Sequence, residues 1–386
     1  MMKRILIVLP SFLNGGTNTS LRNMLPVLKE TGVDIDVFAI TCVGTNREYV
    51  EKFANVIGIG GNSLNNVSKL SLKQKLAKYV KIVKKGLCKI GIDISPVVFN
   101  KVTARLERNN YDLIIAFQEG ITTHFVSCFT HTPKIAWIHC DYKAYLKAVK
   151  CKPETKIYDG FEKVVCVSEF TKQQFIDCVP HKNCIALHNI IDDNSILLRA
   201  KLPIDNPVFN HNQFTILSIG RLDPVKRFEA IPSIINELKQ KDIYDFRWYI
   251  LGGGDENQKR KIEEAIANNN ASELTLLGET NNPYPYIAQA DMVVSTSVSE
   301  ACPNVINEAK ILHTPIVATN FGSVYEFIED GVNGLISPIE SIADKIAMMI
   351  TDQELYHQIK SNISTFRYDN DLLKSKLLTS ILEIES

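Results

Sequence analysis

Two glutamates, Glu300 and Glu308, stand with seven residues between them, after a short apolar run at 292–296. Pro303 suits the first position of a helix, where its missing N–H is not needed. We therefore expect Glu300 in the loop before a helix and Glu308 about five residues into it, ~7 Å further along the axis at ~1.5 Å per residue. Phosphates at the helix mouth and a ribose beside its second turn would fit that spacing. Taken singly, Glu300 could equally be a first-turn acid favoured by the helix dipole, and Glu308 a solvated surface acid.

A pair of cations, Arg221 and Lys226, follows the apolar run at 214–220. Open parallel sheets bind ligands in the loops at the carboxyl ends of their strands. Arginine offers a planar fork of donors and lysine a point charge, so the two could hold a diphosphate between them. As an ordinary surface-loop pair they would carry no function. Their place after a glycine-terminated strand favours the binding interpretation.

A glycine pair, Gly15 and Gly16, separates the first apolar run, at 4–9, from a helical pattern at 19–29. Backbone amides at such a turn can approach an anion, which the helix dipole also favours. By itself the pair is equally typical of a simple turn. Neither this turn nor the glycine triplet at 252–254 has the G-x-G-x-x-G spacing, which disfavours a nicotinamide dehydrogenase.

The residues that could do chemistry lie at the ends of short Val/Ile/Leu runs that alternate with segments of helical period. Strands that are apolar throughout and separated by helices indicate parallel sheets covered on both faces. At about 100 to 200 residues per domain, a chain of 386 residues favours two doubly wound α/β domains with a cleft between them. We expect strands at 4–9, 33–39, 112–117, 134–139, 163–167, 184–188, 214–220, 246–251, 274–278, 292–296 and 315–319.

The domain boundary is predicted in the polar stretch 192–213, which contains two prolines and four asparagines. The first domain would then span 1–195 and the second 213–365. The closing segment, 366–386, has a helical pattern and is expected to cross back to the first domain.

Composition and cysteine usage exclude several classes of protein. With 45% hydrophobic and 22% charged residues, the chain is typical of a globular protein, and no apolar stretch approaches the ~20 residues of a membrane-spanning helix. Nine cysteines without a CxxC pair or zinc spacing predict free thiols in a reducing cytoplasm and no metal site. The D-x-D at Asp34 and Asp36 begins a buried strand, and we interpret it as structural.

Charge is distributed unevenly, because residues 1–190 carry 26 Lys and Arg against 15 Asp and Glu, and the remainder carries 17 against 28. The segment 69–90 holds eight lysines and no acid, with apolar residues repeating at three and four. It predicts an amphipathic helix that either packs with a solvated basic face or contacts an anionic membrane surface. Nucleic-acid binding is disfavoured, because this segment offers a single tyrosine for base stacking.

The spacing of Glu300 and Glu308 resembles the E-x7-E motif of retaining GT-B glycosyltransferases of family 4, and Arg221 with Lys226 resembles that family's second donor-site motif. The resemblance implies two Rossmann-like domains that face a central cleft. It extends over nearly the whole chain, because further segments follow in the family's order, at 14–17, 137–142, 165–169, 187–192, 251–254 and 331–335.

The resemblance also implies roles for single positions. Glu308 would hydrogen-bond the ribose hydroxyls, while Arg221 and Lys226 would hold the diphosphate. Glu300 would touch the donor sugar, the glycine turn would lie near the phosphates, and His139 would border the reacting centre. The implied donor-binding set comprises Gly15, Gly16, Thr17, Arg221, Lys226, Gly278, Pro303, Asn304, Val305 and Glu308, and the implied catalytic set comprises His139, Arg221, Lys226 and Glu300. Cations and a helix dipole would stabilise the leaving diphosphate, so no metal or other cofactor is expected.

We expect a hexosyltransferase that moves a hexose, with retention, from a nucleoside-diphosphate sugar to a saccharide acceptor. UDP is the expected nucleotide, and the favoured acceptor is a lipid-linked oligosaccharide of a bacterial capsule, O-antigen or other surface polysaccharide. The protein would act in the cytoplasm, either free or peripheral on the inner face of the membrane.

Two residues depart from the family pattern: Ala301 and Cys302 stand where glycine and a bulky apolar residue are common. Either Ala301 is strained at positive φ or the loop shifts, which affects the choice of donor sugar. The alternative functions on the same plan are a sugar-nucleotide epimerase, a sugar phosphorylase, and a non-catalytic nucleotide- or polysaccharide-binding subunit.

Overall fold

The computed structural model describes residues 3–13, 15–41, 43–57, 95–204, 209 and 212–382. The chain divides into two compact units, unit 1 with Met1–Ile190 and Asn370–Ser386, and unit 2 with Ile191–Asp369. The amphipathic helix expected at 69–90 and residue Asn14 lie outside the described residues. Within these ranges no helix is long and apolar enough to cross a lipid bilayer.

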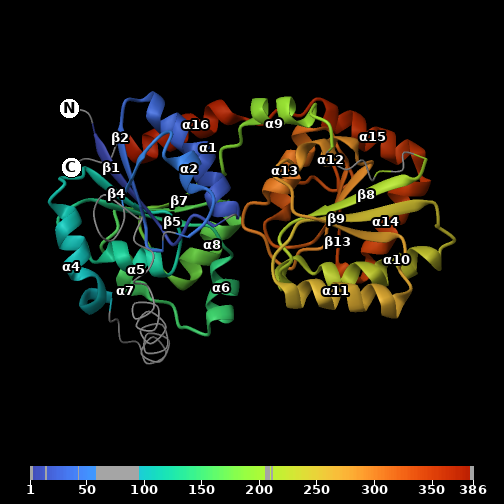
Figure 1. Cartoon of the computed structure of the whole chain (residues 1–386), viewed down its shortest axis with the longest axis horizontal. Helices are drawn as coiled ribbons and strands as arrows, with labels where there is room; N and C mark the ends of the chain where they lie inside the picture. Colours follow the sequence, from blue (N-terminus) through green and yellow to red (C-terminus); the bar gives the residue numbers. More distant parts are fainter. Residues whose placement is uncertain are drawn as a thin grey trace. The chain divides into compact units, whose positions relative to one another are not determined.

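Unit 1 is built on a parallel sheet covered by helices (Figure 1). Within the described residues the sheet has seven strands in the order β3-β2-β1-β4-β5-β6-β7. Ile5 pairs with Ile35 of β2 on one side and with Leu113 of β4 on the other. The strands are apolar throughout because helices cover both faces of the sheet. Their bounds are β1 Arg4–Leu9, β2 Asp34–Ala39, β3 Asn55–Ile57, β4 Leu113–Ala116, β5 Lys134–Ile138, β6 Lys163–Cys166 and β7 Cys184–Ala186.

The helices of unit 1 pack apolar stripes against this sheet. In α1, Leu21, Leu25 and Leu28 repeat at four and three and are fully buried. The closing helix α16 belongs to this unit: the Lys163 amino group donates to the carbonyl oxygen of Ser380 at 3.1 Å. The described helices are α1 Gly16–Glu30, α2 Arg47–Val50, α4 Ser95–Glu107, α5 Ile121–Ser127, α6 Tyr142–Val149, α7 Thr155–Tyr158, α8 Glu169–Cys178 and α16 Asn370–Leu382.

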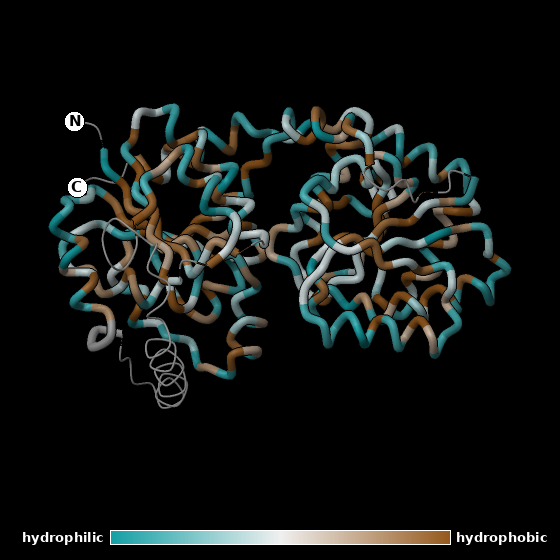
Figure 2. The backbone as a smooth tube through the Cα atoms, viewed as in Figure 1, coloured by the Kyte–Doolittle hydropathy of each residue, from teal (hydrophilic) through white to brown (hydrophobic). Residues whose placement is uncertain are grey.

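Unit 2 repeats the plan with a parallel sheet that has six strands in its described part, in the order β10-β9-β8-β11-β12-β13. Figure 2 shows the hydrophobic segments gathered along the strands of both sheets. The two doubly wound α/β units confirm the predicted fold class. The strands are β8 Phe214–Ile219, β9 Phe246–Leu251, β10 Leu274–Gly278, β11 Met292–Ser295, β12 Ile316–Thr319 and β13 Leu335–Ser337.

The connecting helix α9, Asp193–Ala200, packs on α12 and α13 of unit 2. Ile191 and Ile196 share a small core with Ile311 of α13. Residues 191–195, which the sequence analysis assigned to the first domain, therefore fold with the second. The other described helical segments of unit 2 are η2 Pro224–Lys226, η3 Phe228–Ala230, α10 Ile231–Lys239, α11 Glu256–Asn269, α12 Tyr284–Gln289, α13 Asn304–Ile311, η4 Val324–Glu326, η5 Ile339–Ser341, α14 Ile342–Thr351 and α15 Gln353–Ser364.

The strand order reverses once in each sheet, between β1 and β4 in unit 1 and between β8 and β11 in unit 2. At such a point the loops leave in opposite directions and open a crevice at the carboxyl ends of the strands, where ligands bind. In unit 2 the loops at this point contain Arg221 and Lys226, after β8, and Glu300, after β11.

Candidate functional site

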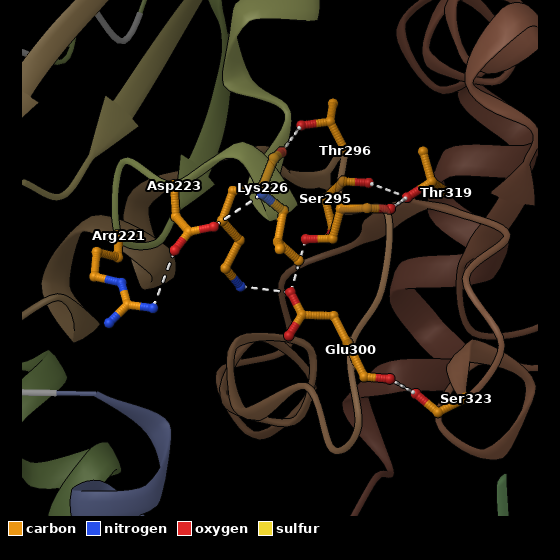
Figure 3. A network of polar contacts seen from close by, with 10 residues as sticks. Arg221, Asp223, Lys226, Ser295, Thr296, Glu300, Thr319 and Ser323 are labelled. Carbon is orange, nitrogen blue, oxygen red and sulfur yellow. Dashed lines mark hydrogen bonds and ion pairs between the residues drawn. The ribbon is translucent and has the colours of Figure 1, made fainter. Parts of the chain in front are cut away.

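Lys226 and Glu300 meet across the point where the unit 2 strand order reverses (Figure 3). The Lys226 Nζ atom lies 2.5 Å from the Glu300 Oε1 atom, and the Ser297 hydroxyl donates to the same oxygen at 2.7 Å. Gly220 has φ +157°, and a Cβ there would lie 2.9 Å from the Cε atom of Lys226. Glycine at the end of the strand therefore leaves room for the lysine side chain.

The two loops are also joined through their backbones. The Thr296 hydroxyl donates to the carbonyl oxygen of Lys226 at 2.7 Å. The backbone N–H of Val298 donates to the carbonyl oxygen of Val225 at 2.8 Å. The carbonyl oxygen of Glu300 accepts from the Ser323 hydroxyl at 2.7 Å. Thr296 and Ser323 are completely buried, so these bonds hold Lys226 and Glu300 in place before any ligand arrives.

Arg221 lies at the exposed side of the same loop. Its guanidinium NH2 atom is 3.1 Å from the Asp223 Oδ2 atom, and its side chain is 66% exposed. Asp223 also accepts the N–H of Val225 at 2.9 Å and thereby starts the short helix η2. The two predicted cations therefore differ in solvent exposure: Lys226 is partly buried, and Arg221 is open to solvent.

Glycines allow the neighbouring loops to approach one another closely. Gly252, after β9, has φ +151°, and a Cβ there would lie 1.9 Å from the carbonyl oxygen of Gly220. Its N–H donates to the carbonyl oxygen of Gly278, the last residue of β10, at 2.8 Å. Gly278 itself has φ +80°, and its surroundings would leave space for a Cβ. The predicted position Gly278 therefore lies at the same sheet edge as the Lys226 loop.

Helix α13 begins at Asn304, with Pro303 as its N-cap, so it starts one residue later than expected. Asn304 and Val305 form its first turn, next to the loop of Glu300. Ala301 is buried and is not among the residues with positive φ, so the strain considered for this position does not occur.

Glu308, the fifth residue of α13, is 9% exposed, which contradicts the surface-acid alternative. Burial raises the pKa of its carboxyl to about 7, while the nearby cations Arg199 and Lys226 act in the opposite direction. Within the part of the chain that the structure describes, the carboxylate has no hydrogen-bond partner. Such a group is available to a ligand that can donate hydrogen bonds.

Arg199 of α9 is a residue that the sequence analysis missed. Its guanidinium lies over the Tyr284 ring, 4.7 Å from the centroid, and donates to the carbonyl oxygen of Asn281. Its own carbonyl oxygen accepts from Asn282 Nδ2 at 2.9 Å. No local pattern singles out Arg199, because it lies in the polar connection where no ligand-binding motif was expected.

In unit 1 the glycine turn lies beside the point where that strand order reverses. Gly16 opens α1, and a Cβ at Gly15 or Gly16 would meet no atom within 4 Å. Thr17 follows in the first turn and is partly exposed. The turn therefore presents open space at a helix N-terminus, as an anion would need.

His139 follows β5 and packs its ring against Phe117 at 4.9 Å between centroids. Burial lowers the pKa of its imidazole to about 3, so the ring is neutral at physiological pH. Its backbone N–H donates to the Glu119 Oε2 atom at 2.9 Å, and its Nε2 atom is buried with no partner among the described residues. Glu119, also missed from sequence, is 8% exposed, and burial raises the pKa of its carboxyl.

In the D-x-D motif, Asp36 is buried and already hydrogen-bonded within the protein. The Asp36 carboxylate accepts from Arg4 at 2.9 Å, Tyr111 at 2.6 Å and Asn55 at 2.9 Å. These contacts stabilise the start of β2 and its neighbours, as the structural interpretation of the motif requires.

Two family models match the chain, "Glycosyltransferase Family 4" at residues 14–195 and "Glycosyl transferases group 1" at residues 204–365. The O-antigen biosynthesis glycosyltransferase WbnH of Escherichia coli is 24% identical, over 92% of this chain and 93% of the relative. The N-acetylgalactosamine-N,N'-diacetylbacillosaminyl-diphospho-undecaprenol 4-alpha-N-acetylgalactosaminyltransferase of Campylobacter jejuni is 26% identical, over 73% of both chains. The crystal structure of HepE from Anabaena in complex with UDP and glucose matches all of both chains, with a TM-score of 0.72 and 18% identity. That likeness shows a shared fold.

Proposed function

Because the chain belongs to the group 1 glycosyltransferases, we propose that it transfers a hexose, with retention, from a UDP-sugar to a saccharide acceptor. The observation that carries the proposal is the Lys226–Glu300 pair, held at 2.5 Å where the unit 2 strand order reverses. Glu308 lies on the helix that follows the Glu300 loop, buried and without a hydrogen-bond partner among the described residues. Unit 2 therefore offers a cation for the diphosphate, Lys226, and two carboxylates for the sugar and the ribose, Glu300 and Glu308.

In the proposed complex, Lys226 and Arg221 hold the diphosphate at the N-terminus of α13, where Pro303, Asn304 and Val305 lie. Glu308 accepts hydrogen bonds from the ribose hydroxyls. Glu300 and the backbone that follows it contact the hexose. The Lys226 ammonium is shared between the Glu300 carboxylate and the phosphate, so it couples sugar binding to leaving-group binding.

The chemical step breaks the bond between the anomeric carbon and the phosphate oxygen and forms a bond from that carbon to the acceptor oxygen on the same face. The leaving phosphate accepts the acceptor's proton, so charge is balanced without a protein nucleophile. Preorganised cations stabilise the charge that develops on the phosphate, and by this reasoning a divalent metal is not required. From the family resemblance, we propose that unit 1 contributes the neutral imidazole of His139 and the glycine turn at Gly16 to the reaction.

We propose a lipid-linked saccharide as the acceptor, and action in the cytoplasm or peripherally on the inner face of the membrane. Support comes from the activities named for the relatives, which are O-antigen biosynthesis for the Escherichia coli protein and transfer to a diphospho-undecaprenol saccharide for the Campylobacter jejuni protein. The charge of unit 1 is compatible with an anionic surface.

A panel of nucleotide sugars in a thermal-shift assay tests the donor, because a ligand at ~100 times its Kd stabilises the folded state by roughly 2.7 kcal/mol. UDP-sugars should raise Tm above GDP- and ADP-sugars, and the Glu308→Ala variant should lose the shift. The matched control is Glu264→Ala, an exposed glutamate on α11. A response to another nucleotide alone would overturn the choice of UDP.

Product analysis separates the proposed reaction from its alternatives. A transferase releases UDP and forms an α-linked product from an α-linked donor, as NMR of the anomeric proton reports. An epimerase would convert the UDP-sugar without an acceptor, and a phosphorylase would require inorganic phosphate. UDP binding without turnover of any donor and acceptor pair would favour the non-catalytic subunit.

A further inference from the structure

The two oxygens of the Glu300 carboxylate differ in their contacts. The Oε1 atom lies 2.5 Å from the Lys226 Nζ atom and accepts the Ser297 hydroxyl at 2.7 Å. Within the described part of the chain, no hydrogen bond reaches the Oε2 atom. The Glu300 side chain is 18% exposed, so a ligand can approach it. The protein therefore uses one oxygen of this carboxylate, and the other can accept hydrogen bonds from a ligand.

Ser297, in the loop after β11, is held in place by hydroxyls of two strands. Ser297 is 2% exposed, and its carbonyl oxygen accepts from the Thr319 hydroxyl of β12 at 2.5 Å (Figure 3). The Ser295 hydroxyl of β11 donates to the Ser297 hydroxyl at 3.3 Å. A hydroxyl carries a single hydrogen, so Ser297 accepts from Ser295 and directs its own hydrogen at Glu300. The neighbouring strands thus fix both the position of Ser297 and the direction of its hydrogen bond.

Ser297 and Lys226 constrain the Glu300 carboxylate in different ways. Lysine is a point charge on a flexible four-carbon stem, whereas the hydroxyl of serine stands one carbon away from the backbone. In the proposed complex the diphosphate competes with Glu300 for the Lys226 ammonium. Ser297 is then the contact that keeps the carboxylate in one orientation while the donor is bound.

We propose that Ser297 is a positioning residue of the donor-sugar site, which fixes the Glu300 carboxylate so that Oε2 accepts a hydroxyl or amide N–H of the hexose. The proposal rests on the proposed function of Glu300 as a ligand of the hexose. In this arrangement Ser297 acts on the hexose through Glu300 and on no other part of the donor. Its hydrogen bond should therefore contribute to the affinity for a UDP-hexose but not to the affinity for UDP.

The size of the effect follows from the hydrogen bond that is lost. A hydrogen bond to a charged group corresponds to about 10- to 100-fold in an equilibrium constant. Lys226 keeps its contact with Oε1 when the hydroxyl is removed, so the carboxylate is only partly released. The Kd for a UDP-hexose should therefore rise about five- to tenfold relative to the Kd for UDP. The turnover number should fall as well, because the hexose is less well oriented for attack.

Calorimetric titration of the full chain measures the Kd for a UDP-hexose divided by the Kd for UDP. The probes are UDP-glucose, UDP-galactose and their 2-acetamido counterparts, without acceptor, and the one that binds the wild type most tightly is kept for the variants. Ser297→Ala should raise the ratio about five- to tenfold, and Ser297→Thr, which keeps the hydroxyl, should hold it within about twofold of the wild type. Ser337→Ala is the matched control, because Ser337 is 3% exposed and donates to the carbonyl oxygen of Pro338 at 3.0 Å.

A double-mutant cycle with Glu300→Ala separates positioning from a general structural effect. Glu300→Ala alone should raise the ratio of the two dissociation constants. Adding Ser297→Ala should raise it no further, because the carboxylate that Ser297 positions is gone. An independent structural effect of Ser297 would instead appear in full in both backgrounds.

The role of Ser297 alone would be overturned if Glu300→Ala raised the ratio and Ser297→Ala left it at the wild-type value. The same conclusion would follow if Ser297→Ala had an equal effect with and without the Glu300 carboxylate. If the wild type binds no UDP-hexose, the proposed function fails. If Glu300→Ala leaves the ratio unchanged, the sugar contact of Glu300 fails, and in both of these cases the role of Ser297 fails with it.

Discussion

Replacing Lys226 by methionine tests whether this ammonium stabilises the leaving group. Methionine keeps most of the aliphatic stem and removes the charge, so the packing around Gly220 is retained. The Glu300 carboxylate would keep the Ser297 hydroxyl at 2.7 Å but lose its ion-pair partner at 2.5 Å. The substitution should lower the free energy of unfolding moderately and the turnover number strongly.

The expected magnitudes follow from the burial of the pair. The Lys226 and Glu300 side chains are 23% and 18% exposed. Exposed ion pairs contribute about 0–1 kcal/mol and breaking buried pairs costs about 3–5, so Lys226→Met should lower the free energy of unfolding by about 1–3 kcal/mol. Turnover should fall by about 10²–10³, as when a single preorganised donor to a developing charge is removed. Adding Glu300→Gln should restore stability, because no uncompensated charge remains, but should not restore turnover.

Urea denaturation and steady-state UDP release measure the two effects. The chain has two tryptophans, Trp137 in unit 1 and Trp248 in unit 2, so fluorescence in a Trp137→Phe background reports on unit 2. Lys241→Met is the matched control, because its ion pair is exposed and screened by solvent. Turnover within about threefold of the wild type would refute the leaving-group role. Equal destabilisation in the single and double variants would refute the charge argument.

Three further substitutions test the arrangement around the site. Gly252→Ala would place a Cβ 1.9 Å from the Gly220 carbonyl oxygen at φ +151°, and should lower the unfolding free energy by more than about 2 kcal/mol in urea denaturation. Trp248→Phe removes the buried indole N–H that donates to the Ser218 hydroxyl of β8 at 3.0 Å. Calorimetry should then show that the free energy of unfolding falls by about 1–3 kcal/mol. Glu119→Ala leaves the His139 N–H without its acceptor and should lower both Tm and kcat, whereas Glu119→Gln should retain Tm; equal Tm values in these two variants would contradict the role of that bond.

The regular elements were predictable because strands buried on both faces appear in the sequence as uninterrupted apolar runs. The strands β3 and β13 were not expected, because their two apolar residues are followed by glycine or by serine and proline. The equally short β7 was expected because its apolar run continues to Leu187. The preference of proline for the first turn of a helix predicted the start of α13 to within one residue. Pro303 lies at the N-cap instead of the first helical position because its ψ of 91° is extended.

The environment of the site residues was less predictable than their identity. Lys226, Glu300 and Glu308 were identified from spacing and family resemblance. The burial of Glu308 has no local signal, because α13 packs on elements distant in sequence such as α9. Arg199 and Glu119 were missed for the same reason, because each acts on a residue that is distant in sequence. The roles of the predicted residues in binding and catalysis remain predictions for the experiments above.

The chain passes from unit 1 into unit 2 after Ile190 and returns at Asn370, so unit 2 is one uninterrupted insertion within unit 1. Both ends of the polypeptide belong to the host unit, where the Lys3 amino group donates to the carbonyl oxygen of Leu382. The residues Lys226, Glu300 and Glu308 therefore lie in one contiguous segment of the polypeptide, Ile191–Asp369. Under the proposed function, one contiguous gene segment would then encode these donor-binding residues.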